Sequence, residues 1–248
     1  MSILIDSHVH VYPSHRTGAV LGAFRRAIER AGAQSGALCL VEREGMDAFG
    51  AWARGENLPG GTRATHVEEN ALLLETPGEK TVAVLAGRQI ACAERVEILA
   101  LGTREKFRDG TPAAEAVATA LSLGAMPVLS WGVGKWLFSR AKVVAALLRR
   151  FPVEDLSIGD TSLRPVFWPE PAAMAEAPSL GRRVLRGSDP LPPASEETRA
   201  GEWADLAEEE LSPDRPVASS LLNILRETPL VPVGRRAGPV EFLRRMSG

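Results

Sequence analysis

Strand-like and helix-like segments alternate along much of this chain. Apolar residues at helical spacing are separated by short apolar runs that are typical of buried strands. The segments are, in order, helix 19–31, strand 36–41, an amphipathic stretch 46–54, helix 112–123, strand 126–131, helix 139–150, strand 155–159 and strand 183–185. Such alternation is typical of a parallel sheet with right-handed crossovers, so we expect an α/β fold.

The region between residues 62 and 101 departs from this alternation. Two apolar runs, 71–76 and 81–86, flank Pro77-Gly78-Glu79-Lys80, which is a hairpin signal, and a further strand is predicted over 96–101. We therefore expect a locally antiparallel β insertion around residues 62–101. A length of 248 residues fits one barrel domain over 1–248, with a helical C-terminal extension from about residue 196.

The first apolar run, residues 3–11, carries Asp6, His8 and His10. A strand has a side-chain period of two, so these three polar groups are predicted to share one face. Burying two imidazoles and a carboxylate is costly unless something compensates, and a divalent metal is the usual partner. The alternative is an edge strand with a solvated polar face.

The end of this first strand also bears on the fold. An open doubly wound sheet usually has a glycine-rich phosphate loop after its first strand, whereas this strand ends in His8-Val9-His10. That difference favours a distorted TIM-like (β/α)7–8 barrel, whose site would lie at the C-terminal ends of the strands.

The composition limits the kinds of molecule that we expect this protein to bind. The chain has 29 Lys+Arg against 31 Asp+Glu, a net charge of −2, so no basic excess points to nucleic acid or to a membrane surface. No segment approaches the roughly 20 apolar residues that span a bilayer. Cys39 and Cys92 lie in apolar stretches without metal spacing, as reduced core residues would. We expect a cytoplasmic protein with a small-molecule, anionic substrate; the sequence leaves its oligomeric state open.

Other predicted strand ends carry polar residues. Asp189 is either a turn cap in Ser188-Asp189-Pro190 or a metal ligand or general base. Lys135, in a glycine-rich loop, is either a solvated lysine or an anion-binding catalytic group, with Arg140 and Arg164 as further substrate-binding candidates. Asp160 is expected to form a structural hydrogen bond to a neighbouring loop. His66 is expected at the polar surface, with metal ligation as the alternative.

Three of these segments resemble a known family. Ile5-Asp6-Ser7-His8-Val9-His10 resembles the first-strand motif of amidohydrolase-type metal-dependent hydrolases and of the related polymerase-and-histidinol-phosphatase (PHP) phosphoesterases. Gly187-Ser188-Asp189 resembles their late Gly-Ser-Asp motif, whose Asp is a metal ligand. Residues 86–90 and 96–101 resemble a middle segment of PHP proteins. The resemblance spans residues 3 to about 190 and implies a distorted barrel of about seven strands with hydrolase activity.

The chain also departs from the PHP pattern. Gln89 stands where that pattern has a bridging Glu, Glu97 stands where it has a His, and no histidine follows His66. The resemblance therefore implies one divalent ion, zinc or manganese, rather than a histidine-rich cluster. Its ligands would be His8, His10 and Asp189, with Glu97, Asp6 or water completing the shell. The expected function is a PHP-like phosphoesterase; the alternatives are an amidohydrolase-like C–N hydrolase and a non-catalytic binding protein.

Overall fold

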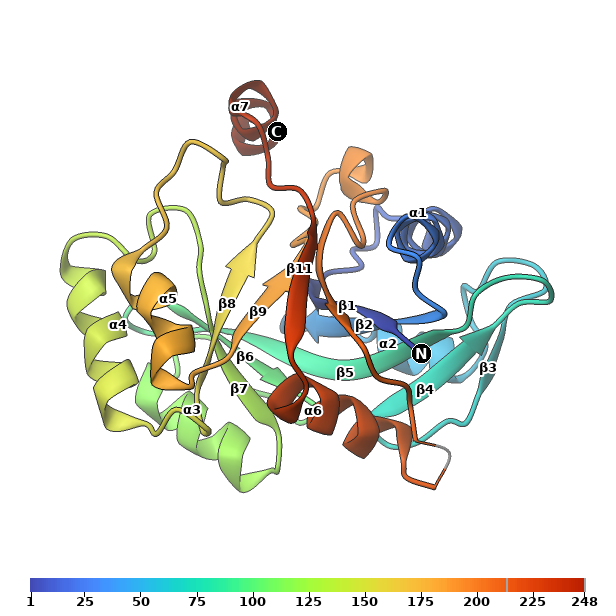
Figure 1. Cartoon of the computed structure of the whole chain (residues 1–248), viewed down its shortest axis with the longest axis horizontal. Coiled ribbons are helices and arrows are strands. Elements are labelled where there is room, and N and C mark those ends of the chain that lie inside the picture. Colours follow the sequence, from blue (N-terminus) through green and yellow to red (C-terminus); the bar gives the residue numbers. More distant parts are fainter. Residues whose placement is uncertain (213, 248) are drawn as a thin grey trace.

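The computed structural model describes residues 1–212 and 214–247 and is a mixed α/β structure (Figure 1). The strands are β1 (Ile3–Val9), β2 (Ser35–Glu42), β3 (Arg63–Thr65), β4 (Ala71–Glu75), β5 (Val82–Ala91), β6 (Glu97–Leu101), β7 (Met126–Ser130), β8 (Ser157–Thr161), β9 (Val184–Gly187), β10 (Trp203–Ala207) and β11 (Leu230–Gly234). The α-helices are α1 (Thr17–Arg30), α2 (Ala48–Ala53), α3 (Ala113–Ser122), α4 (Ser139–Arg150), α5 (Ala172–Glu176), α6 (Val217–Glu227) and α7 (Pro239–Ser247).

All the strands belong to one sheet. Its main path runs β11-β10-β1-β2-β5-β6-β7-β8-β9, and β4 pairs with β5 and with β3 beside this path. The pairs β1–β2, β2–β5, β7–β8 and β8–β9 are parallel, whereas β6 is antiparallel to both of its neighbours. The expected hairpin is confirmed as β4–β5. However, β5 is not part of an insertion, because it lies at the centre of the main sheet between β2 and β6.

The sheet is nearly closed into a barrel, which is compatible with the expected TIM-like architecture. β1 has β2 on one side, and on the other side β10 pairs with residues 3–5. Beyond residue 5, β9 lies beside β1 in place of β10. Ser7 Oγ donates a hydrogen bond to the main-chain oxygen of Arg186, and the amide of Asp189 donates one to the main-chain oxygen of His8, both at 2.8 Å. The side chain of Asp205, in β10, accepts from the Arg186 amide at 2.8 Å.

The segment from residue 196 onward is not the helical extension that the sequence predicts. It contains the helices α6 and α7, but also β10 and β11, which extend the sheet beside β1. β10 includes the buried Asp205 and β11 includes Pro232, so the local sequence predicts a strand in neither segment. Their pairing with each other and with β1 supplies the stabilisation that local propensity lacks.

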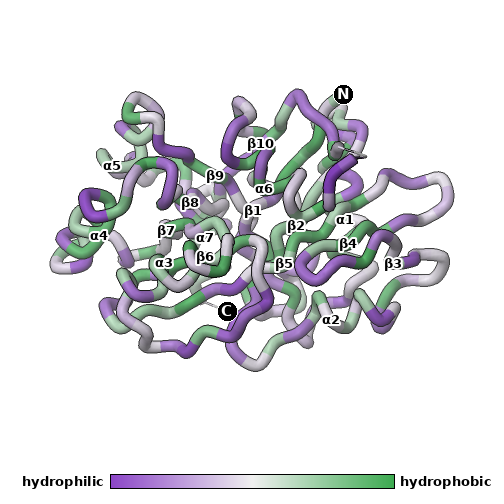
Figure 2. The backbone as a smooth tube through the Cα atoms, turned by 90° about the horizontal axis from the view of Figure 1, so that it is seen from below, coloured by the Kyte–Doolittle hydropathy of each residue, from purple (hydrophilic) through white to green (hydrophobic). Residues whose placement is uncertain are grey.

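The buried apolar residues form three clusters, and the helices pack against the sheet through them. Alternate residues of the barrel strands, such as Ile3 and Ile5, point inward and meet α6, which therefore packs against the barrel interior. α1 covers the outside of β1 and β2 with a face that includes Leu21, Phe24 and Ile28, and α3 and α4 cover β7 and β8. In Figure 2, green hydrophobic segments follow several strands and purple hydrophilic segments follow many loops.

In the part of the chain that the structure describes, no helix is both long enough and apolar enough to cross a bilayer.

Candidate metal centre

His8 and His10 lie at the C-terminal end of β1, where the strand is irregular. The pairing of β1 with β2 shifts register between Asp6 and Val9. Val9 lies in the outer core beneath α1, while the two imidazole Nε2 atoms approach each other to 3.1 Å. The register shift thus separates the histidines from Asp6.

Asp6 does not share the histidines' face, contrary to the strict period of two. Its Oδ1 accepts from the amides of Ser188 (2.9 Å) and His8 (3.2 Å), and its Oδ2 accepts from Ser188 Oγ (2.6 Å) and the amide of Gly201 (2.8 Å). Burial raises the pKa of Asp6 to about 7, although these four hydrogen bonds oppose that effect. Asp6 therefore joins β1 to the segments after β9 and before β10, and it lies outside the group of candidate ligand atoms.

Asp189 directly follows β9, which lies beside this end of β1, and its side chain meets the two histidines there. Its Oδ1 lies 3.4 Å from His8 Nε2 and 3.7 Å from His10 Nε2. Within the described residues, His8, His10 and Asp189 form the one group of three or more His, Cys, Asp or Glu side chains whose ligand atoms lie within 4.8 Å of one another. The sequence prediction for these three residues matches this geometry.

Gln89, from β5, adds a fourth donor atom. Its Oε1 lies 3.1 Å from His8 Nε2 and 2.9 Å from His10 Nε2. Four ligands at about 2.0–2.1 Å from a tetrahedral zinc ion lie about 3.3 Å from one another. The five measured separations among these four atoms run from 2.9 to 3.7 Å. The residues present therefore fit a single divalent ion with two nitrogen and two oxygen ligands.

The protonation states suit this assignment. Burial lowers the pKa of His8 and of His10 to about 4. Both imidazoles are then neutral near pH 7, which is the form that binds metals. Burial raises the pKa of Asp189 to about 6, and a nearby cation would favour its ionised form.

The segment that carries Asp189 is tightly constrained. A Cβ atom at Gly187 would lie only 2.3 Å from the Cβ of His8, so β9 approaches β1 as closely as it does only with glycine at this position. Asp189 has a φ of +48°, in the left-handed region that L-residues seldom adopt. Main-chain bonds on both sides hold it there: its amide donates to His8, and its oxygen accepts from Arg245 Nη2 at 3.0 Å.

Glu97 and Lys135 form a second layer behind Gln89. Gln89 Nε2 donates to Glu97 Oε1 at 3.2 Å, and Glu97 forms an ion pair with Lys135. The structure thus brings both predicted residues close to the centre. Glu97 reaches the imidazoles through Gln89, and it is not among the three residues whose ligand atoms cluster.

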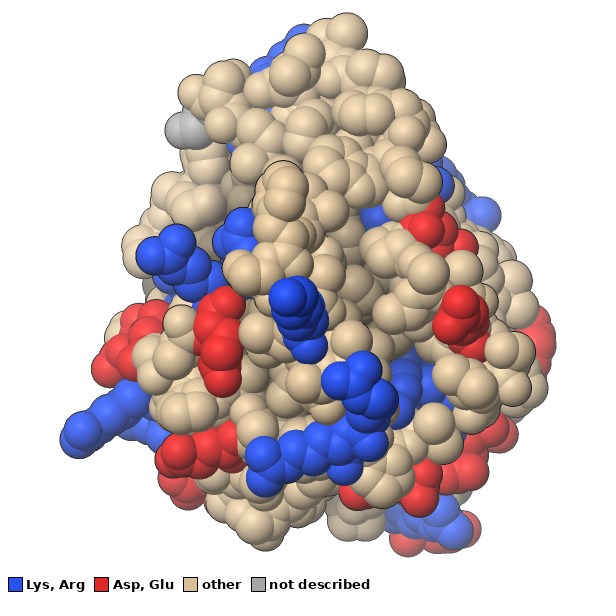
Figure 3. All heavy atoms as spheres, turned by 90° about the vertical axis from the view of Figure 1, so that its left-hand side faces the viewer, with Lys and Arg blue, Asp and Glu red and all other residues tan. Residues whose placement is uncertain are grey.

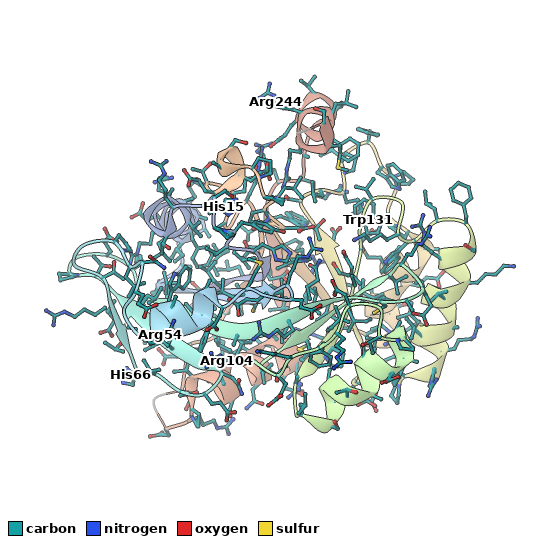
Figure 4. All side chains as sticks on the ribbon, turned by 180° about the vertical axis from the view of Figure 1, so that it is seen from behind. His15, Arg54, His66, Arg104, Trp131 and Arg244 are labelled. Carbon is teal, nitrogen blue, oxygen red and sulfur yellow. The ribbon has the colours of Figure 1, made fainter. Side chains whose placement is uncertain are left out.

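Other predicted residues lie apart. Arg164 is bound to Asp160 through two hydrogen bonds of 2.7 and 2.8 Å, so Asp160 has the structural role expected of it and Arg164 is engaged within the fold. Arg140 is half-buried in the first turn of α4. His66 is exposed between β3 and β4, far from Trp131 in Figure 4, as the surface interpretation predicts. Trp131 is a core residue.

Sequence reasoning missed several contributors. From the sequence, Gln89 is only a departure from a motif, although its oxygen contacts both imidazoles. Ser130 Oγ lies 3.4 Å from His8 Nδ1, and Tyr12 packs beside His10 with ring centroids 5.4 Å apart. Arg245 comes from the C-terminal helix, 56 residues from Asp189. The spacing of Tyr12 two residues after His10 was the one local signal available.

Comparisons with known proteins give structural neighbours only. No protein-family model matches the chain, and no curated protein matches it. The crystal structure of PsfC from Pseudomonas syringae PB-5123 is similar, with a TM-score of 0.57 and 15% identity over 99% of this chain and 95% of that one. The lesion-specific endonuclease PfuEndoQ from Pyrococcus furiosus has a TM-score of 0.55 and 12% identity over 94% of this chain.

A third neighbour is endonuclease Q in complex with a 27-mer duplex substrate that has an abasic lesion at the active site. It has a TM-score of 0.51 and 11% identity over 90% of this chain. The chain spans 59% and 57% of the two endonuclease chains. At these identities the likeness shows the fold. A shared fold does not fix an activity, so the chemistry must be argued from the site.

Proposed function

We propose that this protein is a metal-dependent hydrolase, and more narrowly a PHP-like phosphoesterase that uses one zinc or manganese ion. The observation that carries the proposal is the convergence of His8, His10 and Asp189, whose ligand atoms lie within 4.8 Å of one another. Two neutral imidazoles and a carboxylate, with an amide oxygen beside them, are a donor set that borderline divalent ions accept.

The residues around this donor set have distinct roles in the proposal. When bound, the ion would supply Lewis-acid polarisation of a phosphoryl oxygen and would lower the pKa of a water molecule. Gln89 is oriented by its donation to Glu97, so that its oxygen faces the imidazoles. Lys135 would bind a substrate oxygen and stabilise the negative charge that develops there during hydrolysis.

Two observations favour a phosphate ester over an amide or another C–N bond. Lys135 places a cation beside the ligand group, where an anionic substrate would gain most from it. Two of the structural neighbours are described as endonuclease Q, and endonucleases cleave phosphodiester bonds. The second observation supports the proposal by analogy of fold.

Hydrolysis of two generic probes tests the proposal. Zinc- or manganese-loaded protein is expected to hydrolyse 4-nitrophenyl phosphate or its bis(4-nitrophenyl) diester, and the double variant His8→Ala, His10→Ala is expected to lose that turnover. Lys135→Met should lower kcat about 100-fold while the bound metal is unchanged. His66→Ala, a surface histidine, is the matched control. Turnover of an aryl amide but of neither phosphate would favour the C–N hydrolase instead.

A second candidate is a non-catalytic relative that binds a small molecule. Gln89 supports it, because an amide is neutral where a carboxylate would bind metal more strongly. The Lys135–Glu97 ion pair supports it as well, since an ammonium already neutralises the neighbouring carboxylate. Full metal loading without hydrolysis of any of the three probes would favour this candidate.

A further inference from the structure

A cavity of about 830 Å³ opens beside the candidate metal centre. It lies between the ends of β2 and β5 and the loop that follows β6. Gln89 is one of its lining residues, and the same side chain contacts both imidazoles. The cavity and the candidate centre are therefore continuous through one residue.

The charges that line this cavity are unevenly paired. Of five cations, Arg88 is bound to Glu42 at 3.1 Å and Arg104 to Asp47 at 3.1 Å. Arg104, labelled in Figure 4, also stacks on Phe49 of α2. The remaining cations are Arg43, Lys106 and Arg108, and the remaining carboxylate is Glu44.

Arg43, Lys106 and Arg108 are exposed, and in the described part of the chain none of them forms an ion pair. On the side of the molecule seen in Figure 3, by contrast, Lys and Arg are interspersed with Asp and Glu. Concentrated charge of one sign in a concave site attracts ligands of the opposite sign. The half-buried Met46 and Phe107 add apolar surface for a carbon skeleton.

Arg43 also connects the cavity to the metal centre by a second route. Its guanidinium lies close enough to Tyr12 to oppose the rise that burial causes in the pKa of the Tyr12 hydroxyl. The Tyr12 ring packs beside that of His10, with centroids 5.4 Å apart. A ligand held by Arg43 would therefore lie one side chain away from the histidines. Lys135 approaches the centre from the side of Glu97, through the loop after β7.

We propose that this cavity binds a second anionic group, a phosphate or similar oxyanion, of a small-molecule substrate. Its recognition by Arg43, Lys106 and Arg108 would select substrates that carry an oxyanion besides the one hydrolysed. The claim that the bound group belongs to a substrate rests on the proposed function. The claim that the cavity binds an oxyanion rests only on the residues that line it.

Binding of inorganic pyrophosphate tests the cavity without catalysis. Calorimetry on EDTA-dialysed protein is expected to show pyrophosphate binding that weakens at least tenfold in the variant Arg43→Glu, Lys106→Glu, Arg108→Glu. The control variant Lys142→Glu, Arg149→Glu reverses exposed cations on α4 and should bind as the parent does. Equal affinity in the parent and the triple variant, or equal weakening in the control, would overturn the inference.

Two further measurements distinguish a failure of this inference from a failure of the proposed function. The variant His8→Ala, His10→Ala should keep pyrophosphate binding, so the cavity inference survives even if no metal binds. If a loaded enzyme hydrolyses phosphate esters but its KM for a bisphosphorylated ester is unchanged by Lys106→Glu plus Arg108→Glu, the proposed function stands and this inference falls. A single-stranded oligonucleotide that binds tenfold more tightly than pyrophosphate would overturn the small-molecule class.

Discussion

Arg245, in the last helix, donates a hydrogen bond from Nη2 to the main-chain oxygen of Asp189 at 3.0 Å. Its side chain is 1% exposed and also binds the carboxylate of Glu196 at 2.6 Å and Ser162 Oγ at 2.9 Å. A candidate metal ligand with a left-handed backbone is thus held by a residue 56 positions away. The C-terminal helix is part of the support of the site.

Replacing Arg245 should therefore affect both stability and metal binding. Arg245→Ala removes one partner of a buried ion pair, so we expect a loss of about 3 kcal/mol in the free energy of unfolding. We also expect about tenfold weaker metal binding, because the backbone of Asp189 loses a support. Thermal unfolding and a metal titration at 15 °C measure the two effects. Arg244→Ala, an exposed neighbour, is the control.

The stability loss alone does not test the positioning role. Arg245→Ala combined with Glu196→Gln removes the unpaired buried charge and should recover part of the stability. It should not recover the metal affinity, since the bond to the Asp189 oxygen is still absent. Recovery of both together would show that Arg245 acts on the site only through global stability.

Gln89 offers a direct test of the fourth donor atom. Gln89→Glu should lower the melting temperature of the metal-free protein, because it adds a carboxylate beside Glu97 and Asp189. It should raise the affinity for zinc or manganese about tenfold, since a charged oxygen replaces a neutral one. The metal-induced rise in melting temperature should then exceed that of the parent. Gln89→Leu should weaken binding; unchanged affinity in both variants would exclude Gln89 from the shell.

The attachment of α7 should depend on pH. Partial burial opposes the ionisation of Glu241, but hydrogen bonds from Arg235 and Arg199 outweigh it and lower its pKa to about 2. A carboxyl group whose pKa is lower in the folded state stabilises the fold above its unfolded pKa of about 4.5 and loses that contribution as the pH falls toward 2.

Glu241→Gln should therefore destabilise the protein at pH 7, by about 2 kcal/mol after allowance for solvent screening. The difference in melting temperature between the variant and the parent should shrink steadily between pH 4.5 and pH 2. Thermal unfolding across that pH range measures it. A difference that stays constant with pH would mean that the ionised carboxylate does not hold the helix.

Much of the fold was predictable where the apolar pattern has one interpretation. The helices at 17–30, 113–122 and 139–150 lie within two residues of their predicted ranges, because their apolar spacing of three and four residues allows one buried face. The local sequence does not predict β10 or β11. Asp205 and Pro232 disfavour strands locally, and only the partner strands in the folded sheet overcome that preference.

The site was predictable where a motif names its residues and unpredictable where the backbone departs from regularity. His8 and His10 are predicted as candidate ligands from residue type and spacing, and Asp189 from the resemblance of Gly187-Ser188-Asp189 to a family motif. The period of two predicts the wrong face for Asp6, because the register shift between Asp6 and Val9 depends on strand pairing that the local sequence does not encode. The contact of Arg245 with Asp189 depends on the placement of α7, which no local pattern indicates.

Metal stoichiometry tests the central claim most directly. After reconstitution with zinc or manganese and removal of free ion, elemental analysis of the parent protein should find about one ion per chain. The variant His8→Ala, His10→Ala should retain less than about a tenth of that, while His66→Ala should match the parent; both variants must show a folded far-ultraviolet spectrum. Less than a tenth of an ion in the reconstituted parent, or equal loading in the His8→Ala, His10→Ala variant, would contradict the claim that these residues form a metal centre.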